Sequence, residues 1–319
     1  MLFITNREPR GSIRTKIGRK FKFDLNKNAP TNSVYYCQRN GKDDYKEIGS
    51  KILMDELKKI NKKQILFYIH GFNNLPEKDI FPRAEKLQTF FDNAEPNLIH
   101  IVPLIWPTDN DLGIIKDYWD DQKAADNSAF SFARVLQKFM KWRNDAPTNS
   151  PCLKRINILA HSMGNRVLRE TLSKWNKYDL ANGVPLLFRN TLLLAPDIVN
   201  ESLEENQPAR LISQASRNVS VYFATDDLAL RASKISNLKN MVASRRLGHT
   251  GPEDMKKVQS NVYAIDCDNF NNKYDKPMGH TYFLEDENGK PGKVFNHIFN
   301  TISTGRVFVN KNPDKEYIL

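Results

Sequence analysis

The strongest chemical pattern in the chain surrounds Ser162. An apolar run at residues 156–159 precedes the pentad AHSMG at residues 160–164, and a helical pattern follows it. A strand, a sharp turn with small residues two positions before and two after a serine, and then a helix are typical of a nucleophile elbow. Ala160 and Gly164 are these small residues, because larger side chains would collide with backbone in so tight a turn. The spacing therefore predicts that Ser162 is a nucleophile, and the structural alternative is a serine that caps the next helix.

A histidine late in the chain is the predicted general base. A serine hydroxyl is a weak nucleophile, so it needs a base within hydrogen-bond reach and a third group that orients the base. His280 follows the predicted last strand, at residues 261–265, in a loop that contains glycine. An order of serine, acid and then histidine is known for such triads, and it favours His280. His249 precedes that strand and is the alternative, and no base role is predicted for the remaining histidines, His70, His100, His161 and His297.

Three aspartates are candidates for the acid that orients the histidine. Asp226 and Asp227 are adjacent and follow the predicted strand at residues 218–223. One of the two is also placed to cap the helix that comes next. Asp197 follows the strand at residues 190–195, one strand earlier. Spacing alone does not separate them, so Asp227 is preferred and the other two stay open.

Two backbone N–H groups are the predicted oxyanion hole, which holds the negative oxygen of a tetrahedral intermediate. One donor is the residue after the nucleophile, Met163. The second comes from an early loop of His-Gly type, and the letters HGFNN at residues 70–74 follow an apolar predicted strand. Gly71 lets the backbone turn without a Cβ, which makes Phe72 the predicted donor. An ordinary Gly/Asn turn after a strand accounts for the same letters and does not exclude this role.

The elements around these residues alternate between strand and helix patterns. Such alternation predicts parallel βαβ crossovers and an α/β three-layer sandwich, a mostly parallel central sheet flanked by helices, with the site beyond the carboxyl ends of the strands. The predicted strands are residues 3–5 and 33–36, both as edge strands, and residues 64–69, 98–104, 156–159, 190–195, 218–223 and 261–265. The predicted helices are residues 52–60, 81–91, 114–143, a stretch from about 163, and 294–302. The length suits one domain over residues 1–319, with insertions near 106–127 and 231–259 that shape the pocket.

Basic residues outnumber acidic ones by 48 to 37, which gives a formal net charge of +11. Much of the excess lies in the N-terminal region. A basic face attracts anionic substrates, nucleic acid or anionic membrane, although a solvated surface is the simpler interpretation. No Lys/Arg run is interleaved with aromatic residues, so no nucleic-acid partner is predicted. Contact between the basic N-terminal region and a membrane surface stays open, and the oligomeric state is not predicted.

The cysteines indicate a reducing environment. Cys37, Cys152 and Cys267 are scattered and contain no CxxC pair. An odd, scattered set predicts neither a disulfide framework nor a zinc site, and it fits a cytoplasmic protein. We expect no signal peptide, no transmembrane helix, and no metal or organic cofactor.

Together these motifs resemble the α/β-hydrolase fold family of uncharacterised esterase- and lipase-type proteins. The resemblance implies a triad of Ser162, Asp227 and His280, and it favours Asp227 because the aspartate of the DLAL motif matches the family pattern. It implies little about the substrate. The matching motifs cover nearly the whole chain: ITNR at 4–7, YIHGFN at 68–73, LAHSMGN at 159–165, DLAL at 227–230, RLG at 246–248 and GHTY at 279–282.

Two classes of function are compatible with this sequence. The leading interpretation is a serine hydrolase that cleaves an ester, a thioester or an amide of a small-molecule or lipid-like substrate through an acyl-enzyme on Ser162. The alternative is a non-catalytic binding module with the same fold, since fold does not fix function. A lipase that acts at anionic membranes lies between the two. The presence of all three triad residues favours the enzyme.

Overall fold

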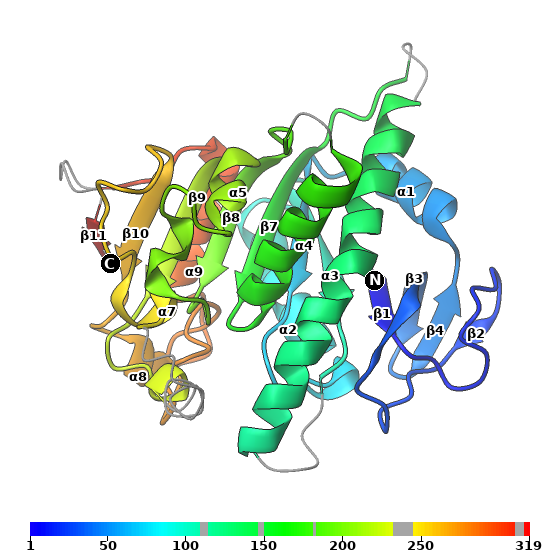
Figure 1. The fold of residues 1–319 in the computed structure, drawn as a ribbon, viewed down its shortest axis with the longest axis horizontal. Helices are drawn as coiled ribbons and strands as arrows, with labels where there is room; N and C mark the ends of the chain where they lie inside the picture. The colour runs from blue at the N-terminus through cyan, green and yellow to red at the C-terminus, as the bar shows by residue number, and fades with distance from the viewer. Residues whose placement is uncertain (109–113, 146–149, 181–182, 232–244, 310–315) are drawn as a thin grey trace. The chain divides into compact units, whose positions relative to one another are not determined.

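In the computed structural model (Figure 1), the chain folds into two compact units. Unit 1 comprises Met1–Ile156 and Glu170–Gly183, and unit 2 comprises Asn157–Arg169 and Val184–Leu319. Strands and helices alternate along most of the chain, as the sequence predicts. The structure describes residues 1–108, 114–145, 150–180, 183–231, 245–309 and 316–319.

Unit 1 contains the strands β1 (Leu2–Arg7), β2 (Lys20–Phe21), β3 (Pro30–Gly41), β4 (Asp44–Glu47), β5 (Gln64–Ile69) and β6 (Ile99–Ile105). They follow one another across the sheet in the order β5-β6-β1-β3-β4-β2. β5, β6 and β1 run parallel, whereas β3, β4 and β2 add antiparallel pairs. The prediction of edge strands at residues 3–5 and 33–36 is wrong, because β1 and β3 each have a neighbour on both sides. Strands of two and four residues, such as β2 and β4, are too short to leave a periodic signal.

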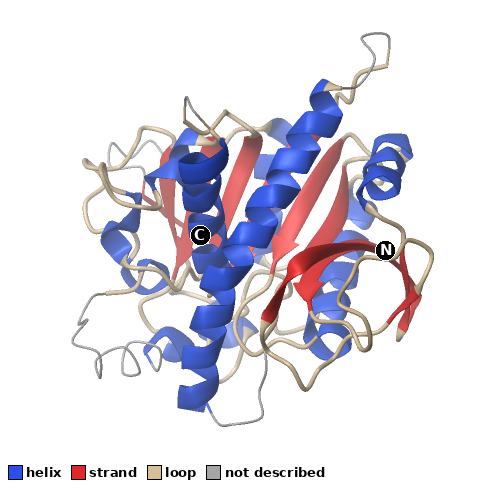
Figure 2. Ribbon diagram, turned by 45° about the vertical axis from the view of Figure 1, so that its right-hand side comes forward, coloured by secondary structure: helices blue, strands red, loops and turns tan. Residues whose placement is uncertain are grey.

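Three helices pack on the strands of unit 1. They are α1 (Ser50–Lys59), α2 (Phe81–Ala94) and α3 (Ile114–Asn144), and a short π-helix, η1 (Pro76–Ile80), leads into α2. α2 packs against β6, and α3 packs against β3. All six residues of β5 are buried, as expected for a strand covered on both faces. Figure 2 shows helices both in front of and behind the strands.

Unit 2 contains a parallel sheet with the strands β7 (Arg155–His161), β8 (Phe188–Leu194), β9 (Ser216–Phe223), β10 (Val262–Asp266) and β11 (Glu316–Ile318). Their order across the sheet is the same as their order along the chain. The prediction that residues 261–265 form the last strand is wrong, because β11 follows and pairs with β10. The helices are α4 (Gly164–Asp179), which begins in this unit, α5 (Arg210–Gln214), α7 (Leu247–Thr250), α8 (Asn271–Tyr274), α9 (Lys293–Thr304) and the 3₁₀ helix η2 (Asn200–Leu203).

A ladder of buried asparagine side chains pins the register of three strands in unit 2. Nδ2 of Asn190 donates to Oδ1 of Asn157 at 2.8 Å, and Nδ2 of Asn218 donates to Oδ1 of Asn190 at 2.9 Å. These residues face one another directly across β7, β8 and β9. A one-residue slip would break both bonds and turn every side chain to the other face. Since the strands are parallel and in register, their carboxyl ends meet at one edge of the sheet.

Part of the predicted pocket-shaping stretches lies outside the described residues, namely 109–113 and 232–244. Residues 114–127 form the first part of α3. Among the described helices, none has the length and apolar character to cross a membrane. All three cysteines are buried and free.

Candidate active site

Ser162 sits at the sharp turn between β7 and α4. Its φ of +53° is in the left-handed region that residues with a Cβ rarely adopt. The turn is held through the backbone of Ser162. Its N–H donates to the carbonyl of Leu194 at 2.9 Å, and its carbonyl accepts the N–H of Asp197 at 3.2 Å. The side chain faces a nearly closed environment, since Ser162 is 6% exposed. This geometry is that of a nucleophile elbow.

Asn165, whose role no sequence motif indicates, stabilises the elbow. It is fully buried in the first turn of α4. Its Nδ2 donates to the carbonyl of Ala160 at 3.0 Å and to that of Ser162 at 2.9 Å. Both acceptors lie in the turn, so one amide ties the end of β7 to the start of α4. Such support stabilises a strained φ that the turn alone would not hold.

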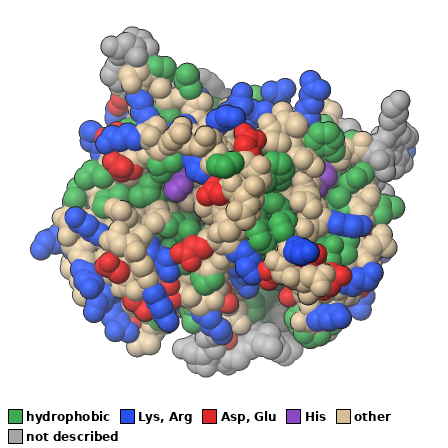
Figure 3. Space-filling view, turned by 180° about the vertical axis from the view of Figure 1, so that it is seen from behind, with side chains coloured by type: hydrophobic (Ala, Val, Ile, Leu, Met, Phe, Trp, Pro, Cys, Tyr) green, Lys and Arg blue, Asp and Glu red, His purple; other side chains and the backbone are tan. Residues whose placement is uncertain are grey.

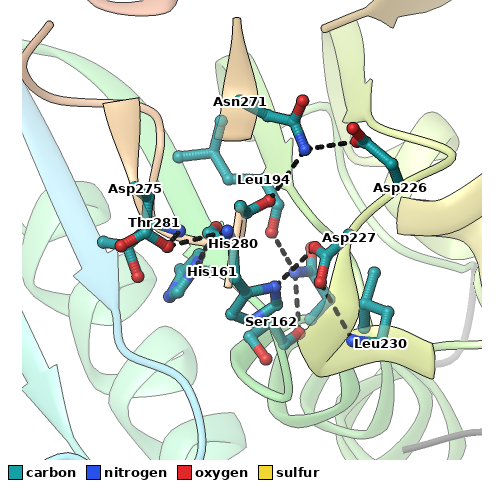
Figure 4. Close-up of polar contacts among 12 residues, drawn as sticks. His161, Ser162, Leu194, Asp226, Asp227, Leu230, Asn271, Asp275, His280 and Thr281 are labelled. Carbon is teal, nitrogen blue, oxygen red and sulfur yellow. Dashed lines mark hydrogen bonds and ion pairs between the residues drawn. The ribbon is translucent and has the colours of Figure 1, made fainter. Parts of the chain in front are cut away.

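Asp227 and His280 are brought together by the structure. Nδ1 of His280 lies 2.6 Å from Oδ2 of Asp227, and the carboxylate is completely buried (Figure 4). The other oxygen, Oδ1, accepts the N–H of Leu230 at 2.9 Å. Asp227 therefore caps the helix that begins after it and binds the imidazole at the same time. With Nδ1 engaged, the remaining ring nitrogen of His280, Nε2, is the one that can exchange a proton with a substrate or a nucleophile.

The two alternative acids have other partners. Asp226 accepts a hydrogen bond from Nδ2 of Asn271 at 2.6 Å and another from Nδ2 of Asn272. Asp197 forms an ion pair with Arg246, with 3.2 Å between Oδ1 and Nε, and both side chains are buried. Asp197 contributes charge near His280 but not the orienting hydrogen bond.

The loop that carries His280 is held by a carboxylate that sequence reasoning missed. Oδ2 of Asp275 accepts the N–H of His280 at 2.7 Å and the N–H of Thr281 at 2.6 Å. Gly279 donates its N–H to the carbonyl of Asp275 at 2.6 Å and has a φ of +61°. Nδ2 of Asn271 donates to the carbonyl of Gly279 at 3.2 Å. An aspartate a few residues before a glycine is a common turn signal, but it does not reveal what the turn supports.

The charges around His280 raise its pKa above the ordinary value of 6.5. Burial acts most strongly and by itself would lower the pKa. The charge and hydrogen bond of Asp227 act in the opposite direction, and the charges of Asp197 and Asp275 add to them. The raised pKa means that the imidazolium is well stabilised, which is what a base needs after it has taken a proton.

The other histidines have contacts of a different kind. Nε2 of His161 lies 3.1 Å from the carbonyl of His280, and the two rings are 4.8 Å apart, so His161 contacts the loop that carries the candidate base. His249 is on the short helix α7. His297 is buried on α9, where Nδ1 lies 2.8 Å from the hydroxyl of Tyr222. Burial lowers the pKa of His100 to about 4.

The predicted oxyanion loop, residues 70–74, follows β5 in unit 1. His70 stacks on Trp106 with ring centroids 5.2 Å apart, and burial lowers its pKa to about 3. The hydroxyl of Thr108 donates to the carbonyl of Asn74 at 2.5 Å. These contacts fix the loop on both sides of Phe72. Met163 adjoins Ser162 in unit 2, and Phe72 lies in unit 1, so their joint role as an oxyanion hole stays a prediction.

Over the part of the chain that the structure describes, no three His, Cys, Asp or Glu side chains are grouped so that they could hold a metal ion.

Residues 46–292 match a protein family described as alpha/beta hydrolase of unknown function (DUF900). Two solved structures are similar, both of phospholipase PlaB from Legionella pneumophila. One is in complex with thio-NAD (13% identity, 64% of this chain, TM-score 0.29) and one is without it (14% identity, 70% of this chain, TM-score 0.31). The alignments span only 37% and 42% of those chains. No curated protein gave a significant match.

Proposed function

Since the chain belongs to this family of α/β-hydrolases, we propose that it is a serine hydrolase that cleaves a carboxylic ester through an acyl-enzyme on Ser162. One observation carries the proposal. His280 is bonded at 2.6 Å to the buried carboxylate of Asp227, in the same unit as the elbow that presents Ser162. A serine, a histidine and a buried carboxylate in this arrangement are the machinery of acyl transfer.

In the proposed reaction, Oγ of Ser162 attacks the ester carbonyl carbon while Nε2 of His280 takes the hydroxyl proton. The tetrahedral intermediate collapses as the imidazolium of His280 gives this proton to the leaving alcohol, and the acyl group stays on Ser162. A water molecule then attacks the acyl-enzyme while Nε2 of His280 takes its proton. The imidazolium returns this proton to Oγ of Ser162 as the carboxylic acid leaves. Asp227 holds the imidazole tautomer and stabilises the imidazolium throughout. Among the described residues, no hydrogen bond joins Oγ of Ser162 to His280, and such bonds commonly tighten only when substrate binds.

The oxyanion of the intermediate is the second element of the proposal. The N–H groups of Met163 and Phe72 are the proposed donors. Met163 follows the nucleophile directly, which supports its role. Phe72 is supported by the rigid loop around it, because preorganised donors stabilise developing charge without rearrangement. We further propose that the enzyme works in a reducing, cytoplasmic environment, which the three free, buried cysteines support.

Activity-based labelling tests the function directly. A fluorophosphonate probe should label the wild type and fail to label Ser162→Ala. Ser213→Ala, which removes a buried hydroxyl on α5, is the matched control and should label normally. A panel of esters, thioesters and amides, run with the same three proteins, would then define the substrate class. Equal labelling of wild type and Ser162→Ala would refute Ser162 as the nucleophile. Absence of labelling and of turnover of every substrate by folded wild type would favour the non-catalytic binding module.

A further inference from the structure

The segment from Arg10 to Lys22, which follows β1 and contains β2, is a mostly exposed part of unit 1 that the proposed mechanism does not use (Figure 1). We name residues 10–22 the basic loop. Every residue from 10 to 18 is exposed. We propose that the basic loop docks the protein onto the surface of an anionic lipid membrane.

The first observation is positive charge without counter-charge. The basic loop contains six Lys and Arg residues and no Asp or Glu. Arg19 is neutralised by the buried Glu47, with 2.7 Å between Nε and Oε2. The other five are exposed and have no ion-pair partner among the described residues: Arg10, Arg14, Lys16, Lys20 and Lys22. On the face that Figure 3 shows, basic and acidic side chains are interspersed.

A pair of like charges on β2 and β4 also favours an anionic partner. Lys20 on β2 lies directly opposite Lys46 on β4, and both are exposed. Like charges directly opposite each other destabilise a strand pair. An anionic surface laid against this edge would remove the repulsion. Membranes with anionic lipids supply such a surface, and each Lys or Arg near it adds to the attraction.

The second observation is that large apolar side chains are exposed among these charges. Ile13 is 52% exposed and Ile17 is 67% exposed. Ile17 also lines a groove together with Ile52 of α1, which is 45% exposed, so the apolar surface continues beyond the loop. Apolar side chains flanked by Lys and Arg are the composition of segments that bind at membrane interfaces, where the apolar group enters the boundary between head groups and acyl chains.

The backbone of the basic loop is fixed while these side chains project. The hydroxyl of Tyr35 donates to the carbonyl of Ile13 at 2.6 Å. The N–H of Lys16 donates to Oε1 of Glu47 at 3.0 Å, and the N–H of Gly18 donates to the carbonyl of Glu47 at 2.7 Å. A loop that is already ordered loses little conformational freedom on binding, which favours association.

The side chains favour a lipid surface over nucleic acid. Protein surfaces that bind single-stranded nucleic acid combine basic residues with exposed aromatic rings on which bases stack. The only aromatic ring of the basic loop is Phe21, which is completely buried. Its exposed apolar groups are isoleucines, which have no flat face for a base but suit an acyl environment.

Vesicle sedimentation of the full chain tests the proposal. Wild type should bind vesicles of phosphatidylcholine with phosphatidylserine, should bind vesicles of phosphatidylcholine alone much more weakly, and should be released by salt. Arg14→Gln/Lys16→Gln should weaken binding about 30-fold, at about fivefold for each charge. The matched control Arg217→Gln/Lys256→Gln removes the same charge from exposed positions in unit 2 and should bind like wild type. Ile13→Asn/Ile17→Asn, which keeps the charge, should weaken binding at least about tenfold.

Thermal melting of each variant separates binding from folding, since all four substituted side chains of the loop are exposed and should leave the melting temperature unchanged. Absence of binding to the anionic vesicles, or an equal loss in the control pair, would overturn the proposal. So would binding of a labelled single-stranded RNA that Arg14→Gln/Lys16→Gln abolishes and Ile13→Asn/Ile17→Asn leaves intact. Hydrolysis of a soluble ester should be unchanged in every variant, so a failure here is distinct from a failure of the proposed function.

Discussion

Gly279, which precedes the candidate base, is a sensitive point for how the site is positioned. Its φ of +61° costs about 1–2 kcal/mol for any residue with a Cβ. A Cβ at this position would also lie 2.2 Å from Oδ1 of Asn272 and 2.7 Å from Nδ2 of Asn271. Both distances are far inside van der Waals contact, so either the asparagines or the loop must move. The Asn271 amide is already engaged with Asp226 and with the Gly279 carbonyl, and therefore the loop with His280 is expected to shift.

The expected loss of catalytic rate follows from the shift of the loop that carries His280. A displacement of about 1 Å at a reacting group costs about 100-fold in rate. We therefore expect Gly279→Ala to lower kcat/KM on the best ester about 100-fold. The strained φ should lower the free energy of unfolding by about 1–2 kcal/mol, and the clash should add to this loss.

Gly289→Ala is the matched control. Its φ is +73°, but a Cβ there would meet only Oε2 of Glu285 at 4.0 Å. It should lose about 1–2 kcal/mol of stability from the strained φ and keep wild-type kcat/KM. Steady-state ester kinetics and urea unfolding of both variants decide the matter. If Gly279→Ala kept wild-type kcat/KM, the argument that this loop holds the base in place would be refuted.

Other predictions concern the acid, the pH profile and metals. Asp227→Asn should lower kcat about 10⁴-fold through the wrong imidazole tautomer, whereas Asp226→Asn should change kcat little and cost roughly 1 kcal/mol of stability; a larger kcat loss at Asp226 would contradict the assignment. Since the pKa of His280 is raised, kcat/KM should rise with pH through an apparent pKa above 6.5. Asp275→Asn should move the rise of kcat/KM to lower pH, because it removes one negative charge that raises the pKa of His280. A rise at the same pH as in wild type would contradict this effect of Asp275. EDTA should leave ester turnover unchanged, and loss of activity that zinc restores would count against a serine mechanism.

Much of the fold could be predicted from local patterns. The apolar run at residues 64–69 coincides with β5, and the helical spacing at 114–143 matches α3 within one residue. Long periodic segments carry such information because burial on one face repeats along the chain. The short strands β2, β4 and β11 could not be predicted, since strands of two to four residues have no period to detect.

Part of the candidate site could likewise be predicted from the sequence, and part could not. The turn at Ser162 could be predicted from the sequence alone, because a tight strand-to-helix turn excludes all but small residues at positions 160 and 164. The sequence left three aspartates open as the acid. The folded structure separates them: Oδ2 of Asp227 lies 2.6 Å from Nδ1 of His280, while Asp226 and Asp197 have other partners. The direction in which adjacent side chains leave a turn depends on what packs around it.

The residues that support the site could not be predicted from the sequence. Asn165 and Asp275 hold the elbow and the histidine loop through side-chain bonds to backbone groups. Neither residue belongs to a motif whose chemistry can be read from spacing. Buried polar groups must find partners wherever the fold brings them, so their roles follow from the assembled structure and not from the local sequence.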